Sequence, residues 1–160
     1  MKAFEDRNDI VNVVVGDGIT EIGRLSFISC DNMTSVVLPD SVTIIDGRAF
    51  EDCISLASIN IPNGVTSIGD TEFYYCTSLA SITLSESLTV IGGLAFGVCT
   101  ALAEVTVPAA TPPTIDGEDL FDGCTALTAI YVPAASVDAY KAASNWSTYA
   151  SLIQAIPSGD

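Results

Sequence analysis

The sequence repeats a pattern of nine positions, and this repetition limits the possible fold more than any other feature. Four copies that carry it are IGRLSFISC at 22–30, IDGRAFEDC at 45–53, IGDTEFYYC at 68–76 and IGGLAFGVC at 91–99. Their cysteines are spaced by 23 residues, and Cys124 follows after 25. A unit of this length cannot bury an apolar face alone, so we expect the units to stack into a solenoid with a shared interior.

Each repeat contains two short extended segments. After each cysteine, apolar residues alternate with polar ones, and alternation with period two predicts a β-strand. The alternating pairs are Val13/Val15, Val36/Leu38, Ile59/Ile61, Ile82/Leu84, Val105/Val107 and Ile130/Val132. We therefore expect six strands, joined by five arcs that run from a phenylalanine to a cysteine. A second extended piece is expected before each arc, as in TSIG at 66–69.

The spacing of Leu79, Ile82 and Leu84 is that of leucine-rich repeats. The whole unit, LASINIPNGVTSIGDTEFYYCTS at 56–78, resembles the BspA-like, Treponema pallidum type of that superfamily, and the resemblance covers residues 13–133. It implies a mainly β or α/β solenoid, right-handed and curved, with parallel strands on its concave face. Residues 1–12 are then an N-terminal edge segment, and residues 134–160 a C-terminal cap and tail.

Three positions depart from the repeat. Glu72 stands where Ala49 and Ala95 precede the phenylalanine, so we expect its carboxylate to turn outward or to be paired. Ser85 replaces the proline that closes most of the strands. Two residues are inserted between Pro108 and Phe121, where the pair at 112–113 is expected to make an extended corner.

The repeat stops after Pro133, and a helical cap is expected there. Ser136 is a suitable residue to begin a helix. Trp146, Tyr149 and Ile153 are expected to cover the last coil, since an exposed parallel edge invites the addition of another strand.

The residue types narrow the chemistry. The chain has no histidine, which removes Ser-His-Asp and Cys-His catalysis and zinc sites that need a histidine. A serine with a lysine base would need Lys2 or Lys141, and a pair of carboxylates would need a cleft. The cysteine column predicts small buried side chains, with stacked disulfides as the alternative. We predict no catalytic residue, no resident metal and no cofactor.

Acidic residues dominate the charge. The chain has 20 acidic and 5 basic residues, and a net charge of −15 argues against nucleic acid and anionic lipid as partners. No apolar run is long enough to insert into a membrane. Acidic or amide residues recur at Asp17, Asp40, Asn63 and Glu86, and again at Asp46, Asp70 and Asp116. These columns are expected to form polar turns, with calcium binding as the alternative.

The candidate binding residues point outward from the predicted concave strands. They are Val37, Asn60, Thr83, Thr106 and Tyr131. Tyr131, together with Tyr74 and Tyr75 on an arc, is suited to stacking on a sugar ring or gripping a peptide. A serine and threonine ladder also favours strand geometry without any ligand.

The resemblance implies a noncatalytic binding module at the cell surface or outside the cell, although no signal peptide begins this chain. Its expected partner is a protein, for example a host or extracellular-matrix protein, and less so a glycan. The alternative is a structural spacer within a larger surface protein. The residues do not determine the oligomeric state.

Overall fold

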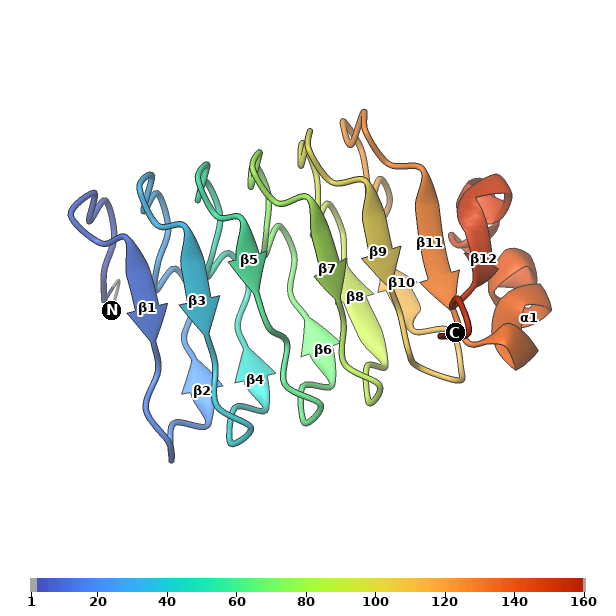
Figure 1. Ribbon diagram of the computed structural model, residues 1–160, viewed down its shortest axis with the longest axis horizontal. Coiled ribbons are helices and arrows are strands. Elements are labelled where there is room, and N and C mark those ends of the chain that lie inside the picture. Colours follow the sequence, from blue (N-terminus) through green and yellow to red (C-terminus); the bar gives the residue numbers. More distant parts are fainter. Residues whose placement is uncertain (1–2, 160) are drawn as a thin grey trace.

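The computed structural model describes residues 3–159, so Met1, Lys2 and Asp160 lie outside the described part of the predicted terminal segments. The chain winds into a row of coils that runs from one terminus to the other (Figure 1). The first strands of the coils are β1 (Asn12–Val14), β3 (Ser35–Val37), β5 (Ser58–Ile59), β7 (Ser81–Thr83), β9 (Glu104–Thr106) and β11 (Ala129–Val132). The second strands are β2 (Glu21–Ile22), β4 (Ile44–Ile45), β6 (Ser67–Ile68), β8 (Val90–Gly92) and β10 (Thr114–Asp116). Every pairing between the described strands is parallel, which confirms the predicted curved solenoid.

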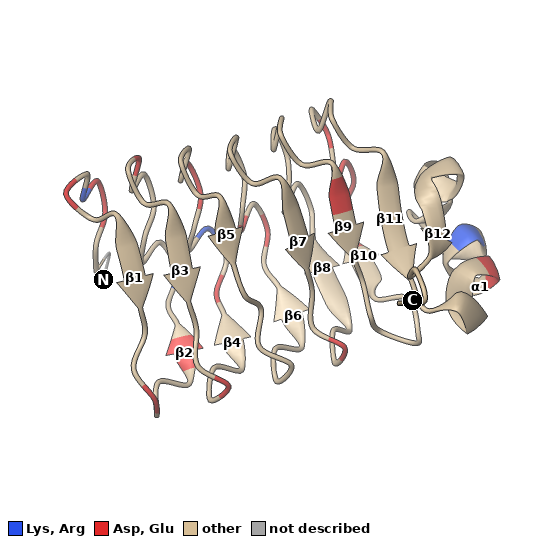
Figure 2. Cartoon of the chain, in the orientation of Figure 1, with Lys and Arg blue, Asp and Glu red and all other residues tan. Residues whose placement is uncertain are grey.

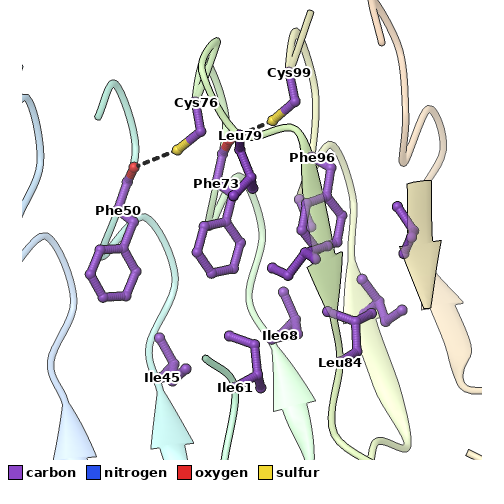
Figure 3. Close-up of a cluster of buried hydrophobic side chains, with 14 of the residues drawn as sticks. Ile45, Phe50, Ile61, Ile68, Phe73, Cys76, Leu79, Leu84, Phe96 and Cys99 are labelled. Carbon is purple, nitrogen blue, oxygen red and sulfur yellow. Dashed lines mark hydrogen bonds between the residues drawn. The ribbon is translucent and has the colours of Figure 1, made fainter. Parts of the chain in front are cut away.

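The interior is one continuous column of matching side chains. Neighbouring phenylalanine rings stack with centroids 5.1–5.7 Å apart, from Phe4 to Phe121. Phe50, Phe73 and Phe96 are completely buried, and Figure 3 shows them side by side in a row, with the labelled isoleucines and Leu84 below them. Because each coil covers the next, stability comes from stacking rather than from any coil alone.

The five cysteines form a second column and are free thiols. Each thiol donates a hydrogen bond to the phenylalanine carbonyl of the preceding coil, as from Cys76 to Phe50 and from Cys99 to Phe73 (Figure 3). The Sγ to O distances along the column are 2.9–3.2 Å. The predicted burial is therefore correct, and the disulfide alternative is wrong. The prediction missed the bond from the thiol to this carbonyl, which also accepts from the cysteine N–H of its own arc, as the Phe50 carbonyl does from Cys53.

The repeat extends further at both ends than the sequence analysis predicted. Phe4 stacks on Phe27, and its backbone N–H donates to the Ser26 carbonyl at 2.8 Å, so residues 4–10 form a sixth arc. At the other end, β12 (Ile153–Ala155) pairs with β11 as a seventh strand, with Ile130 opposite Ile153. Ile153 therefore continues the sheet instead of covering it.

The cap between β11 and β12 consists of a 3-10 turn η1 (Ala134–Ser136), the short helix α1 (Val137–Ala142) and a 3-10 turn η2 (Ser147–Leu152). The predicted helix is present, but Ser136 does not cap it through its side chain. Its hydroxyl donates to the Ala110 carbonyl at 2.7 Å, while Trp146 Nε1 donates to the Pro113 carbonyl at 2.7 Å. The two-residue insertion thus provides the carbonyls on which the cap is anchored.

Glu72 contradicts its prediction. Its side chain is fully buried, and neither carboxylate oxygen has a hydrogen-bond partner. Burial raises the pKa of this carboxyl well above its ordinary value, with Asp46 and Glu51 adding to the rise and the facing Ala49 backbone opposing it. The arc cannot turn this side chain outward, because the alanines at the same position in neighbouring coils point into the core.

The first-strand sheet is interrupted, although a continuous sheet was predicted. It divides into β1-β3-β5 and β7-β9-β11-β12, and the second-strand sheet divides into β2-β4 and β6-β8-β10. The arcs stay stacked across the interruption, with Phe50, Phe73 and Phe96 at 5.4–5.6 Å. The coils are therefore stacked continuously on the arc side, while the pairing of strands is interrupted on the other side.

Candidate binding surface

One face of the solenoid presents the outward side chains that lie in or directly after the first strands, and we call it the ladder face. Its residues are Val14, Val37, Asn60, Thr83, Thr106, Tyr131 and Gln154. The helical cap lies at the C-terminal end of the row, so no helix covers this face in the described part of the chain (Figure 1). A bare, regular sheet of this kind offers an extended surface to a partner.

The structure places the predicted binding residues in two groups. Thr83 lies opposite Thr106, and Thr106 lies opposite Tyr131, so these three form a continuous row. Val37 lies opposite Val14 in the other half, where the two valine side chains are 51% and 77% exposed. The ladder face therefore has an apolar N-terminal half and a more polar C-terminal half.

Asn60 separates the two halves, and its side chain is committed to the protein itself. Its Oδ1 accepts from the Leu38 N–H at 2.8 Å, and its Nδ2 donates to the Leu38 carbonyl at 2.8 Å. Elsewhere the equivalent N–H donates to a backbone carbonyl, as from Leu84 to Thr106. An asparagine amide competes with backbone pairing in this way, which explains why β5 ends one residue early.

Gln154 is a ladder-face residue that the sequence analysis missed. It lies opposite Tyr131 in the β11–β12 pairing and is exposed. The signal was present, because Ile153 follows Ile130 by 23 residues, but the last strand has lost the flanking phenylalanine and cysteine. Counting the period forward would have found this strand, and counting backward from Phe27 would have found Phe4.

The electrostatics of the ladder face are negative. Glu104 in β9 is the one charged residue among the described first strands, and it lies opposite Ser81. Acidic residues also occur at the turns that follow the strands, whereas the described lysine and arginine residues lie on arcs and in α1 (Figure 2). Arg48, for example, pairs with Glu51 on an arc. A cation that approaches the face meets no like charge on the strands.

The cysteine column offers little nucleophilic chemistry. Burial raises the pKa of the Cys30, Cys53 and Cys76 thiols, which keeps them protonated. Cys124 differs because it is partly exposed and the neighbouring Cys99 thiol lowers its pKa, while the pKa of Cys99 is raised. A thiolate is the reactive form, so Cys124 is the most reactive position in this column.

The acidic columns do not converge. Within residues 3–159, no group of three or more acidic, cysteine or histidine side chains lies close enough to hold a metal ion.

The three tyrosines do not form one cluster. Tyr75 is exposed on its arc beside Tyr74, with ring centroids 5.9 Å apart, but Tyr131 lies on a strand. The described residues also contain no helix with the length and apolar character to cross a bilayer.

A hollow near the ladder face lies at the interruption between β5 and β7. It measures about 570 Å³ and is lined by both strands and the turns that follow them, including Asn60, Thr83 and Glu86. A smaller hollow of about 270 Å³ lies beside the cap, between Glu118 and Tyr149. The larger hollow contains two of the predicted binding residues, whereas the smaller one contains none.

Comparison with known proteins places these features in a family. The family model described as "BspA type Leucine rich repeat region (6 copies)" matches residues 1–128. No curated protein sequence matches the chain. The solved Treponema pallidum leucine-rich repeat protein is 32% identical with a TM-score of 0.71, and the alignment covers 78% of this chain and 60% of that one. A leucine-rich repeat protein from Bacteroides ovatus is 29% identical with a TM-score of 0.67, covering 78% and 40%. This chain thus spans less than two thirds of either structure.

Proposed function

Because the chain belongs to the BspA-type leucine-rich repeat family, whose members are generally protein-interaction or scaffold modules, we propose that it is a noncatalytic binding module for a protein. The proposed contact surface is the ladder face, which corresponds to the concave sheet of the family. The observation that supports this proposal most is the uncovered row of Thr83, Thr106 and Tyr131 beside the exposed valines. Tyrosine is enriched in protein interfaces and among the residues that contribute most to binding.

The proposal includes a location at the cell surface or outside the cell. It rests on the family, whose members are typically surface or secreted proteins. The expected partner is a host or extracellular-matrix protein, with a glycan as a weaker candidate. The acidic surface favours partners with a basic contact region, because complementary charge accelerates association.

The experiment is a binding screen of the purified chain against extracellular-matrix proteins and glycans, with and without calcium. The variant Thr106→Ala/Tyr131→Ala should weaken capture of any protein found by about tenfold or more, since a central aromatic often contributes over 1 kcal/mol. Thr114→Ala, in the exposed part of β10 on the other sheet, is the matched control. Capture that survives the double variant would move the site away from the ladder face.

The second candidate is a spacer that displays other parts of a larger protein. It is favoured by the polar side chains around the sheet, which bond to the neighbouring coil and not outward. Thr34 and Ser35 both bond to Asn12, and Thr128 donates to the Ala103 carbonyl. The spacer would be favoured if the chain bound none of the matrix proteins or glycans and if none of them changed its unfolding transition.

A further inference from the structure

The hollow between β5 and β7 arises from a specific gap in the hydrogen bonding of the first-strand sheet. Just before the first strands, the Ala57 N–H donates to the Thr34 carbonyl and the Ala103 N–H donates to the Ala80 carbonyl, each at 2.9 Å. The Ala80 N–H makes no such bond to the Ala57 carbonyl. Just after the first strands, the Val107 N–H donates to the Tyr131 carbonyl at 2.8 Å. The Ile61 N–H does not donate to the Thr83 carbonyl in the same way. Within the described residues, the backbone groups that face the gap therefore lack the partners that their equivalents have.

The core is partly uncovered beside the gap. Val36, Ile82 and Val105 point inward from neighbouring strands and are buried, whereas Ile59, at the same position, is partly exposed. An apolar floor thus lies beneath a rim of polar backbone and side-chain groups. Such a combination suits a ligand group with an apolar stem and a polar head.

Two departures from the repeat frame the gap. Asn60 directs its amide to Leu38 in the preceding coil, away from β7. Ser85 is fully buried, and its hydroxyl donates to the Asn63 carbonyl at 2.9 Å, which ties the two turns together below the gap. The hollow is therefore framed by satisfied contacts on both sides, as expected of a preorganised site.

In the described part of the chain, the hollow presents unpaired N–H groups of Ala80 and Ile61, and its acceptor groups are suited to a cation. The carbonyls of Ala57 and Thr83 accept no hydrogen bond from the neighbouring strand. The hydroxyls of Ser58 and Ser81 lie on the rim. The carboxylate of Glu86 lines the lower end, while Glu104 lies opposite Ser81 at the neighbouring strand. No lysine or arginine lines the hollow, so its potential is negative without compensation.

We propose that this hollow is a recognition site for a lysine or arginine side chain on an extended segment of a protein partner. The aliphatic stem lies over Ile59, and the charged head bonds to Glu86 and the free carbonyls. The assignment rests on the proposed function as a protein-binding module, and it specifies the partner chemistry of the ladder face. It adds a contact at the interruption in the sheet to those proposed at the aromatic end.

The test follows backbone amide shifts of the whole chain in ¹⁵N-labelled protein, on addition of a short synthetic peptide of alternating serine and arginine. The expected result is saturable shifts confined to residues 57–61 and 80–86. A peptide in which glutamine replaces arginine should produce none. Diffuse shifts over all acidic turns would show only general attraction to a protein with a charge of −15, and would overturn the proposal.

A matched pair of variants separates the local site from the overall charge. Glu86→Gln should lower the affinity for the serine–arginine peptide by about three- to tenfold, because it removes a charged acceptor within the hollow. Glu21→Gln removes the same charge from an exposed position in β2 and should leave the affinity unchanged. Equal weakening by both variants would contradict a local site.

The outcome also distinguishes this site from the proposed function. If a protein partner is lost in Thr106→Ala/Tyr131→Ala but bound normally by Glu86→Gln, the ladder face binds and the hollow does not. If no protein is captured but the peptide shifts the residues of the hollow, the cation site stands without the proposed function.

Discussion

At the scale of single residues, Glu72 is the most costly feature of the fold. A buried polar group without a hydrogen-bond partner destabilises a protein by about 1–3 kcal/mol. Neither oxygen of the Glu72 carboxyl has such a partner. Alanine occupies the equivalent positions 49 and 95, where it is fully buried. We therefore expect Glu72→Ala to stabilise the protein by about 1–3 kcal/mol at neutral pH, as measured by urea unfolding. Glu118→Ala, which removes an exposed carboxylate, should change stability by less than about 0.5 kcal/mol.

The same carboxyl sets a pH dependence with a definite sign. Because burial raises the pKa of Glu72 in the folded state, the folded protein binds more protons than the unfolded one above the ordinary pKa of about 4.3. Its contribution to stability is then fully present below that pH and is lost as the pH rises toward the folded pKa. The stability difference between Glu72→Ala and the parent should grow over this range, and a pH-independent difference would contradict a raised pKa.

Cysteine reactivity provides a second prediction at this scale. The thiols of Cys53 and Cys76 are buried, hydrogen-bonded and held protonated, while Cys124 is partly exposed with a lowered pKa. An aromatic disulfide reagent at pH 8 should modify Cys124 first and the other thiols only as the protein unfolds. The rapid phase should disappear in Cys124→Ser. A rapid phase that remains in this variant would mean that another thiol of the column is accessible.

At the scale of elements, Asn60 is predicted to cause the interruption of the sheet. Thr83 and Thr106 hold the equivalent outward positions in strands that pair normally. Asn60→Thr should therefore let β5 extend and pair with β7, which protects the Ile61 and Ala80 amides from hydrogen exchange. We expect a net stability change within about 1 kcal/mol, because the two bonds to Leu38 are exchanged for ladder bonds. Thr106→Val, in a strand that is already paired, is the control and should leave these amides unchanged.

The elements also show what could be predicted from the sequence. The paired strands, the stacked phenylalanines and the cap helix follow from a period of 23 residues and alternating apolar positions, which are properties of the unit itself. The gap between β5 and β7 does not follow from them. It depends on whether the Asn60 amide turns toward solvent or toward Leu38, and both are compatible with an outward residue in a strand.

The arcs illustrate the same limit. Each arc bends through residues with left-handed backbone conformations, which are usually glycine or asparagine. Here these residues include Leu25, Arg48, Tyr75 and Val98, with φ between 57° and 66°, alongside residues of the expected types such as Gly123 and Asp52. Stacking and hydrogen bonding between arcs therefore override local preference, so no single repeat read alone would have revealed these turns.

At the scale of the molecule, the two ends of the solenoid differ. At the C-terminal end, Tyr140 and Trp146 are buried against each other, and each donates a hydrogen bond to the inserted corner. At the N-terminal end of the described chain, Phe4 is 40% exposed and Val14 is 77% exposed. The apolar surface of the ladder face is therefore concentrated at the end that the described residues leave uncovered.

The coils contact their neighbours in a linear order, so whole coils are expected to be exchangeable units. Deleting residues 39–61 removes one 23-residue period. Leu38 then precedes Pro62, where Ile61 stands in the parent. The columns of phenylalanine and cysteine then remain in register, so the shortened chain should fold with parallel β structure and a single cooperative transition. Its stability should be lower than that of the parent, because one coil-to-coil interface is lost. Circular dichroism and thermal unfolding measure both.

Deletion of residues 39–50 is the matched control, since it removes about half a period, including β4 and Phe50. It leaves an arc without its strand and places a gap in the stack of rings, so we expect aggregation or a broad transition. If both deletions behaved alike, continuity between coils in register would not be the main source of stability. A cooperative transition in the 23-residue deletion alone would identify the coil as the unit of folding.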